Sequence, residues 1–174
     1  MVHMDRLCYF CAVAYVRYYL DKWVHFFTAH SRHGTHSPFV YRLVDEVIYA
    51  KRLPGEPQDK VARLVERLIG RFQCRTLYTL GSEPEPTAPL DFVRVDCSTY
   101  GWPVAHEIDA LWPRLHAGSV LVLSAIYRDA QSKALWQSIK AHPHVTVTVD
   151  LFRVGLVFFH AGQAKEDFKI RWRG

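Results

Sequence analysis

Four cysteines are the first residues whose chemistry could define a function, through metal binding or redox exchange. Cys8 and Cys11 form a C-x-x-C pair, which is half of the pattern typical of structural zinc sites and redox thiols. Cys74 and Cys97 are single and distant, so the spacing does not complete a four-cysteine site. Within an apolar helix such a pair is more typical of small buried thiols, and we expect no metal at these residues.

Three histidines that recur at every third residue are the next candidates for metal binding: His30, His33 and His36. Neutral imidazole is a good metal ligand. Because no carboxylate lies nearby in the sequence, hydrogen bonding and capping within a loop is the favoured role. We therefore predict no metal site here either.

The elements that must position any site are read from hydrophobic periodicity, which divides the chain into a helical front and an α/β back. Helical spacing predicts helices over residues 5–28, 37–48, 61–72, 104–115 and 130–141. Apolar runs predict strands over residues 75–80, 90–96, 119–126, 145–151, 155–159 and 168–172. Ser37 and Pro38 are typical of a helix start, Pro113 must kink or end its helix, and Ala117-Gly118 reads as a turn.

Strands that alternate with helices predict right-handed crossovers and a layered α/β fold. Residues 119–126 are continuously apolar, which is typical of a strand covered on both faces. We predict a truncated Rossmann-like sheet of about five strands. Residues 1–73 form an N-terminal helical region packed on the sheet, residues 74–174 form the α/β core, and together they make one structural domain.

Composition describes an ordinary globular chain of 174 residues, 49% hydrophobic and 22% charged. Such values exclude disorder, a collagen-like repeat and a disulfide scaffold. The longest charge-free stretch near the N-terminus, residues 7–16, is about half of the ~20 residues needed to span a bilayer, so we expect no membrane span. Cysteines without a signal-peptide pattern indicate a reducing, cytoplasmic setting.

The net charge of +5 lies entirely on the first part of the chain. Residues 1–80 hold twelve Lys and Arg against seven Asp and Glu, whereas residues 81–174 hold ten of each. This asymmetry is compatible with an acidic partner such as RNA, and it is also typical of a solvated helical face. RNA binding through the basic N-terminal helices stays open as one alternative.

Two stretches carry a resemblance to a known family. The segment His33-Gly34-Thr35-His36-Ser37-Pro38-Phe39 resembles an N-terminal motif of bacterial class I S-adenosylmethionine-dependent methyltransferases of the O-methyltransferase-like group, and residues 89–172 resemble the second half of that family. The resemblance implies a sheet whose last strand is inserted antiparallel between the fifth and sixth. It also implies S-adenosylmethionine at the carboxyl ends of the first two strands.

The chain departs from that family where the donor should bind. The resemblance implies a glycine-rich turn after the first strand and a ribose-binding acid after the second, yet Gly81 is the only candidate glycine. The chain reaches the equivalent of the fourth strand nine residues later, which leaves no room for the second and third strands. Asp96 matches the acid that closes the fourth strand, whereas Ser124 and Tyr127 stand where the family carries acidic residues and a histidine. Asp96, Ser124 and Tyr127 are therefore candidates for a vestigial pocket.

Arg94 is expected in an internal strand, where an unpaired charge is costly, so we expect Asp91 or Asp96 to pair with it. Loss of two strands would also turn residues 75–80 into a sheet edge. The acidic, proline-rich residues 82–89 block such an edge, or a second chain covers it. We therefore expect a homodimer mate or a protein partner at this edge.

These observations predict a shortened, degenerate methyltransferase-like protein that has lost S-adenosylmethionine binding. It would act as a non-catalytic binding or scaffolding module, a pseudoenzyme without a cofactor. The enzyme alternative is a methyltransferase whose donor site is completed by a dimer mate or a partner subunit. In that case S-adenosylmethionine is the cofactor.

Overall fold

The structure is a computed structural model, and it describes residues 2–31, 36–83, 87, 89–98, 104–160, 162 and 164–172, with the side chains of residues 2–12, 104 and 105 left out. Its elements in chain order are α1 (Val2–Thr28), α2 (Pro38–Leu43), the π-helical turn η2 (Val44–Ile48), α3 (Lys60–Phe72), β1 (Leu77–Thr79), β2 (Leu90–Asp96), α4 (Val104–Leu111), the 3-10 turn η3 (Trp112–Arg114), β3 (Leu115–Ser124), α5 (Ala130–Ala141), β4 (Val147–Asp150), β5 (Val154–Phe158) and β6 (Glu166–Lys169). The predicted α/β class is confirmed.

The strands form one mixed sheet in the order β1-β2-β3-β5-β4-β6. The described part of the chain thus has six strands, where about five were predicted. β1, β2 and β3 run parallel, β5 is antiparallel to both β3 and β4, and β6 is parallel to β4. The antiparallel strand between β3 and β4 is β5, whereas the last strand, β6, lies at the edge of the sheet beside β4. The resemblance implies instead that the last strand is the inserted one. Every strand except β5 ends at one side of the sheet, which we call the carboxyl edge.

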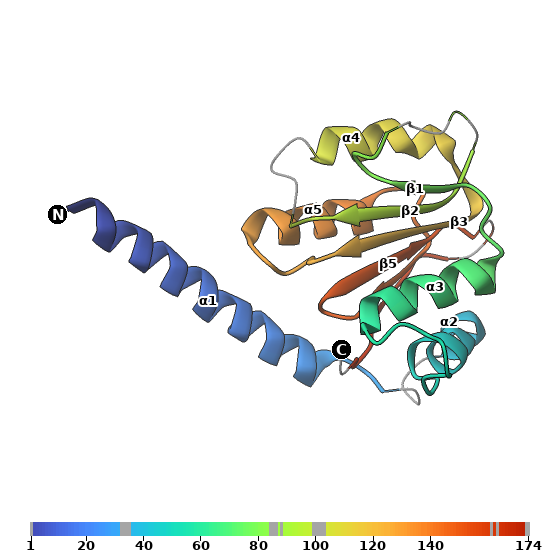
Figure 1. Cartoon of the computed structure of the whole chain (residues 1–174), viewed down its shortest axis with the longest axis horizontal. Coiled ribbons are helices and arrows are strands. Elements are labelled where there is room, and N and C mark those ends of the chain that lie inside the picture. The colour runs from blue at the N-terminus through green and yellow to red at the C-terminus, as the bar shows by residue number, and fades with distance from the viewer. Residues whose placement is uncertain are drawn as a thin grey trace.

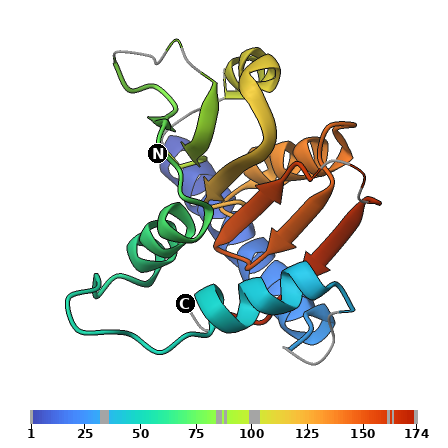
Figure 2. The ribbon, with the colours of Figure 1, turned by 90° about the vertical axis from the view of Figure 1, so that its right-hand side faces the viewer.

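Helices cover both faces of the sheet, with α4 and α5 on one and α2, η2 and α3 on the other (Figures 1 and 2). Side chains along β2 and β3 alternate between two buried apolar clusters: Val93 and Leu121 pack with the α4–α5 side, whereas Phe92 and Val122 pack with the α2–α3 side. This two-sided burial explains why β3 lacks polar alternation, and it confirms the prediction made from residues 119–126.

Helix ends follow the expected capping chemistry in two places and depart from it in one. The Asp59 carboxylate accepts a hydrogen bond from the Ala62 amide at the start of α3, at 2.7 Å, and Asp129 caps α5 in the same way. The helix start predicted at Ser37 and Pro38 is confirmed, but the Ser37 side chain forms no capping bond, and its carbonyl accepts a bond from the Tyr41 amide. The helix predicted over residues 37–48 widens into the π-helical η2 after α2.

β3 begins earlier than predicted, and Ala117-Gly118 lies inside it instead of forming a turn. Between the register pairs Leu90↔Leu115 and Phe92↔Val120, β2 advances two residues while β3 advances five. The extra residues form a bulge, and a bulge resembles a turn in sequence because both favour small residues.

Other strand boundaries differ for local reasons. β1 spans three residues instead of residues 75–80, because the amides of Arg75 and Thr76 bond to the Asp91 carboxylate at 2.8 and 2.9 Å. β6 ends at Lys169, and only Ile170 extends it, through an isolated bridge to His30. The expectation for Pro113 is confirmed, since α4 ends at Leu111 and the proline lies in η3.

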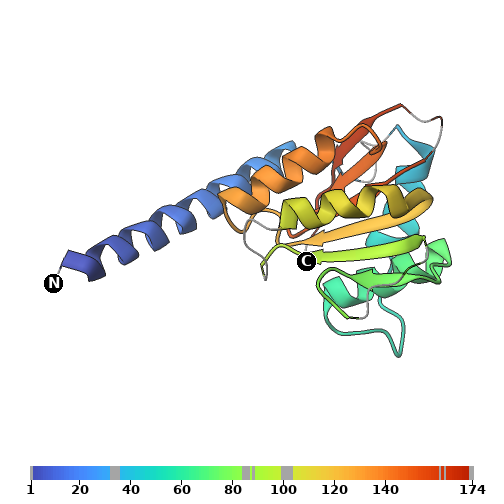
Figure 3. The same cartoon turned by 90° about the horizontal axis from the view of Figure 1, so that it is seen from above.

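The long helix α1 extends well beyond the sheet, with its N-terminal end far from the α/β body and its C-terminal half near α5 (Figures 1 and 3). It contains 27 residues. Within the part of the chain that the structure describes, neither this helix nor any other combines the length and apolar character needed to cross a membrane.

Candidate functional site at the carboxyl edge

A buried polar cluster lies where β4 ends at the carboxyl edge, and Asp150 is its centre. Asp150 Oδ1 lies 3.0 Å from His25 Nε2 and accepts a hydrogen bond from the Phe152 amide at 2.9 Å. Oδ2 accepts bonds from the Tyr127 hydroxyl at 2.7 Å and the Trp136 indole at 3.3 Å. Both oxygens are therefore fully engaged by groups of the chain itself. We call Asp150, His25, Tyr127 and Trp136 the Asp150 cluster.

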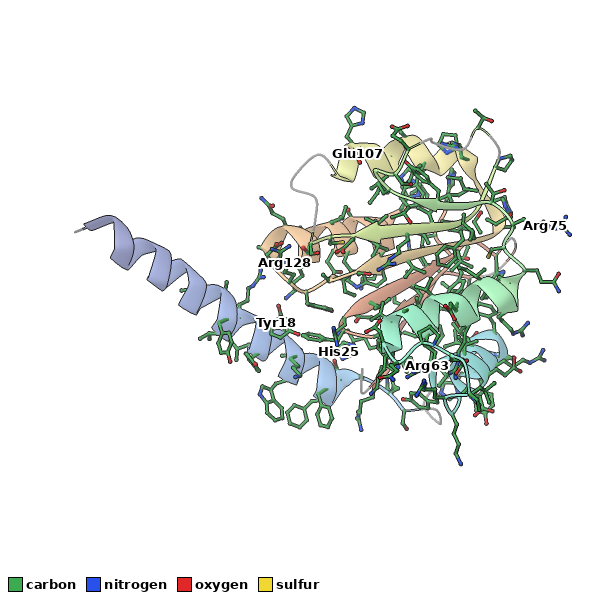
Figure 4. All side chains as sticks on the ribbon, in the orientation of Figure 1. Tyr18, His25, Arg63, Arg75, Glu107 and Arg128 are labelled. Atoms are coloured by element: carbon green, nitrogen blue, oxygen red, sulfur yellow. The ribbon has the colours of Figure 1, made fainter. Side chains whose placement is uncertain are left out.

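Four separate segments supply this cluster. His25 comes from α1, Tyr127 from the loop after β3, and Trp136 from α5. Tight turns aim the loop groups, since Ala125 and Phe152 adopt left-handed backbone angles, with φ of 60° and 70°. The rings of Tyr127 and Phe152 stack with centroids 5.0 Å apart. Figure 4 shows His25 on the side of α1 that faces the sheet.

The charge state of the cluster suits a structural clamp. Burial pushes the pKa of Asp150 upward, but hydrogen bonds and charge from His25, with the bonds from Tyr127 and Phe152, outweigh burial and hold that pKa below its usual value. Burial, then the charge of Asp150, raises the pKa of Tyr127 well above its ordinary range. At neutral pH Asp150 is thus an anion and Tyr127 a hydrogen-bond donor.

A second contact links α1 to the body. Lys133 Nζ on α5 lies 2.6 Å from Asp21 Oδ1, one turn before His25. The Tyr18 ring packs against Phe152, with centroids 5.2 Å apart. One face of α1 is therefore fastened over the carboxyl edge, at the ends of β3 and β4.

The structure brings together two of the predicted pocket residues and separates the third. Asp96 and Ser124 are register partners at the ends of β2 and β3. The Asp96 carboxylate accepts a bond from the Ser98 amide, and Ser124 Oγ is buried with no hydrogen-bond partner among the described residues. Tyr127 turns away from them and joins the Asp150 cluster.

Gly81, the candidate for donor binding, follows β1 with a φ of 81°. The Ser82 amide bonds back to the Thr79 carbonyl at 2.9 Å, which closes a tight turn. Glycine adopts the positive φ that this turn requires at position 81 without steric cost. Residues 84–86 and 88 of the following loop lie outside the described residues.

His25, Trp136 and Asp150 are the members of the cluster that sequence reasoning missed. Asp150 ends an apolar strand, and His25 is the polar residue within the otherwise apolar residues 23–27 of α1. A polar residue at an apolar position indicates a buried hydrogen-bond partner, but the sequence around His25 or Asp150 does not identify that partner. The two residues are 125 positions apart, so only the fold pairs them.

An aromatic pocket of about 350 Å³ lies beside the cluster, between α1 and the end of the chain. Its lining is Tyr19, Lys22, Trp23, His25, Phe26, Phe152, Arg171 and Trp172. The Arg171 guanidinium lies 5.0 Å from the centre of the Phe26 ring, a cation–π distance. The pocket is mainly apolar, and two of its polar members have partners: His25 contacts Asp150, and Arg171 donates to the Ala29 carbonyl.

A larger cavity of about 510 Å³ between η2 and α3 is lined by four cations, Lys60, Arg63, Arg67 and Arg171. Arg67 is fully occupied there: it forms a bidentate pair with Glu56 at 2.7 and 2.6 Å and donates to the carbonyls of Val47, Ala50 and Lys51. Arg67, one of the basic residues in the N-terminal part of the chain, therefore holds the loop before α3.

The thiol and imidazole candidates do not form a site in the described part of the chain. No group of three His, Cys, Asp or Glu there could hold a metal ion. Burial raises the pKa of the Cys97 thiol to about 12. The side chains of Cys8 and Cys11 and the whole of His33 lie outside the described residues.

Arg94 differs from expectation. Its Nε is buried without a hydrogen-bond partner among the described residues. Asp91 instead bonds to His116, 3.0 Å away, and Asp96 to the Ser98 amide. The predicted pairing with either carboxylate is wrong: strand alternation places Asp91 and Arg94 on opposite faces of the sheet, and Asp96 bonds to an amide of the loop that follows β2.

Comparison with known proteins adds no relative. No family model matches the chain, and no curated protein or solved structure matches it significantly. The methyltransferase resemblance of residues 33–39 and 89–172 thus stays a prediction.

Proposed function

We propose that the chain is a non-catalytic binding and scaffolding module with a shortened, methyltransferase-like α/β core. The observation that carries this proposal is the Asp150 cluster, which occupies the end of β4 at the carboxyl edge with groups bonded to one another. An acid or base in catalysis needs a free position for the substrate proton. Asp150 has none, since its two oxygens accept four bonds from the chain.

The connection between β1 and β2 supports loss of donor binding. β1 ends at Thr79 and pairs directly with β2, which begins at Leu90. In α/β sheets a nucleotide-like ligand binds at the carboxyl ends of neighbouring strands, held by a glycine-rich turn and an acid after the next strand. Here Gly81 forms a closed turn, and no strand lies beyond β1 in the described sheet to carry the acid.

Isothermal titration of the full chain with S-adenosylmethionine tests this proposal. We expect no measurable heat of binding, because the ribose-binding acid and its strand have no counterpart. S-adenosylhomocysteine serves as a second probe, since it lacks the positive sulfonium. Micromolar binding of either compound would overturn the proposal.

Free thiols at Cys74 and Cys97 agree with the cytoplasmic setting that we propose for the module.

A methyltransferase whose donor site is completed in trans is the second candidate. Two observations favour it. Asp96 and Ser124 lie side by side, and the buried Ser124 hydroxyl has no hydrogen-bond partner within the described part of the chain. β1 is an edge strand of the described sheet, and its Leu77 is 48% exposed. A second chain could pair with that edge. Transfer of a labelled methyl group by a purified complex, when neither component transfers it alone, would support this candidate. Inactivity of every purified complex would count against it.

A further inference from the structure

The outward face of α1 presents an apolar seam with the spacing of a coiled coil. Val13, Val16, Leu20, Trp23 and Phe27 follow one another at intervals of three, four, three and four residues. This is the a/d spacing of the heptad repeat, in which helices pair through an apolar stripe. All five side chains are exposed in the single chain, from 50% for Val13 to 73% for Phe27. We call these five residues the α1 seam.

The α1 seam lies opposite the face that holds α1 to the body. Tyr18 and His25 mark the body face, since Tyr18 packs on Phe152 and His25 joins the Asp150 cluster. At about 100° per residue, the seam residues lie roughly 140–220° around the helix axis from Tyr18. In Figure 4 both labelled residues lie on the inner side of α1. A helix that met the seam would therefore not collide with the sheet.

The exposed apolar area is of the size that a stable dimer buries. At the positions that flank the seam in the heptad repeat, Tyr19, Val24 and Phe26 of α1 are at least 39% exposed. If an aromatic side chain counts for roughly 150–250 Å², the exposed parts of these eight residues sum to on the order of 800 Å². A standard interface buries about 800 Å² per partner. Monomeric proteins rarely leave apolar patches above roughly 300–600 Å² uncovered.

The charges of this segment favour helix pairing over a membrane surface. Between Val13 and Phe27 the ionic residues are Arg17, Asp21 and Lys22, and none occupies a seam position. Asp21 is paired with Lys133 of the body. A helix that lies on a membrane carries a broad cationic polar face opposite its apolar one. Here the protein body covers that opposite face.

We infer that α1 is the interface for a second copy of this chain. The two copies pair seam to seam about a twofold axis, so that each seam buries its own counterpart. The two α/β bodies then lie on the outer sides of the helix pair. This inference rests on the proposed scaffolding function and names a second copy of the chain as the binding partner. Self-association is measured without S-adenosylmethionine, so a failed dimerisation test is distinct from a failure of the S-adenosylmethionine titration.

Sedimentation velocity of the full chain over a wide concentration range tests the inference. We expect a species of twice the 20.2 kDa chain mass. Leu20→Glu places a charge in the seam and should weaken the dimer at least tenfold. Tyr15→Glu is the matched control: Tyr15 is 64% exposed and Leu20 is 60% exposed, but Tyr15 lies off the seam. This control should change the dissociation constant less than threefold.

At concentrations where the wild-type chain is monomeric, both glutamate variants should keep its circular dichroism spectrum and thermal midpoint, because both substituted side chains are exposed in the single chain. Leu20→Ile keeps an apolar seam residue and should keep the dimer. A wild-type chain that sediments as a monomer at every concentration would overturn the inference, as would equal weakening by both glutamate variants. Co-sedimentation of a monomeric wild-type chain with phosphatidylcholine–phosphatidylserine vesicles, lost in Leu20→Glu, would assign the seam to a membrane instead.

Discussion

Asp150→Ala is the substitution expected to damage this fold most, because it removes the acceptor of four buried bonds. Each buried donor left without an acceptor costs about 1–3 kcal/mol, and the Tyr127 hydroxyl, the Trp136 indole and the Phe152 amide would all lose theirs. His25 Nε2 would keep a partner, because it also lies 3.1 Å from the backbone carbonyl of residue 150. Water that enters the new space would recover part of this cost. We therefore expect a loss of about 4 kcal/mol in unfolding free energy, a large share of the roughly 5–15 kcal/mol typical of a domain.

Tyr127→Phe gives a graded version of the same test. The phenylalanine ring keeps the stack on Phe152 and loses only the hydroxyl that donates to Asp150 at 2.7 Å. A hydrogen bond to a charged group is worth about 1.5–3 kcal/mol, and we expect a loss in that range. The double variant should lose less than the sum of the two, by about 1 kcal/mol or more, because both substitutions remove the same bond.

Urea unfolding of the full chain, followed by circular dichroism and by tryptophan fluorescence, measures these losses. Trp136 lies in the cluster, so its emission reports on the site directly. The wild-type chain should also lose stability in acid. Since the pKa of Asp150 is lowered in the folded state, its contribution is present above the ordinary value of 3.8 and disappears as the pH falls through the folded pKa. An Asp150→Ala chain within about 1 kcal/mol of wild type, or additive losses in the double variant, would refute the clamp.

Three further substitutions test the packing and one salt bridge. Gly155→Ala should cost about 1–3 kcal/mol in urea unfolding, because the new Cβ would lie 2.7 Å from Trp136; a neutral result would contradict the packing of α5 on β5. Gly70→Ala is the opposite case, since nothing lies within 4 Å, and it should add about 0.5–1 kcal/mol through helix propensity. Hydrogen bonds from Arg67, then from the Leu53 amide, lower the pKa of Glu56 to about 2. Glu56→Gln should be less stable than wild type at neutral pH, and the difference should vanish as the pH falls from 4.5 toward 2.

Local patterns predicted most of the elements, and the errors arose where distant groups act on the backbone. The bounds of α5 are those predicted, because an Asp129 cap and a regular apolar face specify them locally. β1 is shorter than predicted because Asp91, which follows it in the sequence, takes the amides of Arg75 and Thr76. Asp91 reaches these amides only because β1 pairs with β2, and hydrophobic periodicity does not predict which strands pair.

The candidate site was harder to predict than the fold. Tyr127 was identified through the family resemblance, as a residue of a vestigial pocket, and the structure places it in a different group of residues. His25 was one of ten histidines, and nothing in its neighbourhood indicated a carboxylate partner. Burial raises the free-energy cost of leaving a polar side chain without a hydrogen-bond partner. Burial is known only once the chain is folded, so the sequence alone does not predict which polar side chains must pair.

The two faces of α1 make separable predictions, because one stabilises the single chain and the other meets a second copy. Asp150→Ala should lower the unfolding free energy and loosen α1 from the body, which limited proteolysis would detect as faster cleavage within residues 13–31. Leu20→Glu should halve the sedimenting mass while the proteolysis rate of the single chain stays unchanged, since the Leu20 side chain is 60% exposed in the single chain. If Leu20→Glu also destabilised the monomer, the seam would already be packed within one chain. If Asp150→Ala left the cleavage rate unchanged, the Asp150 cluster would not be what fastens α1 to the sheet.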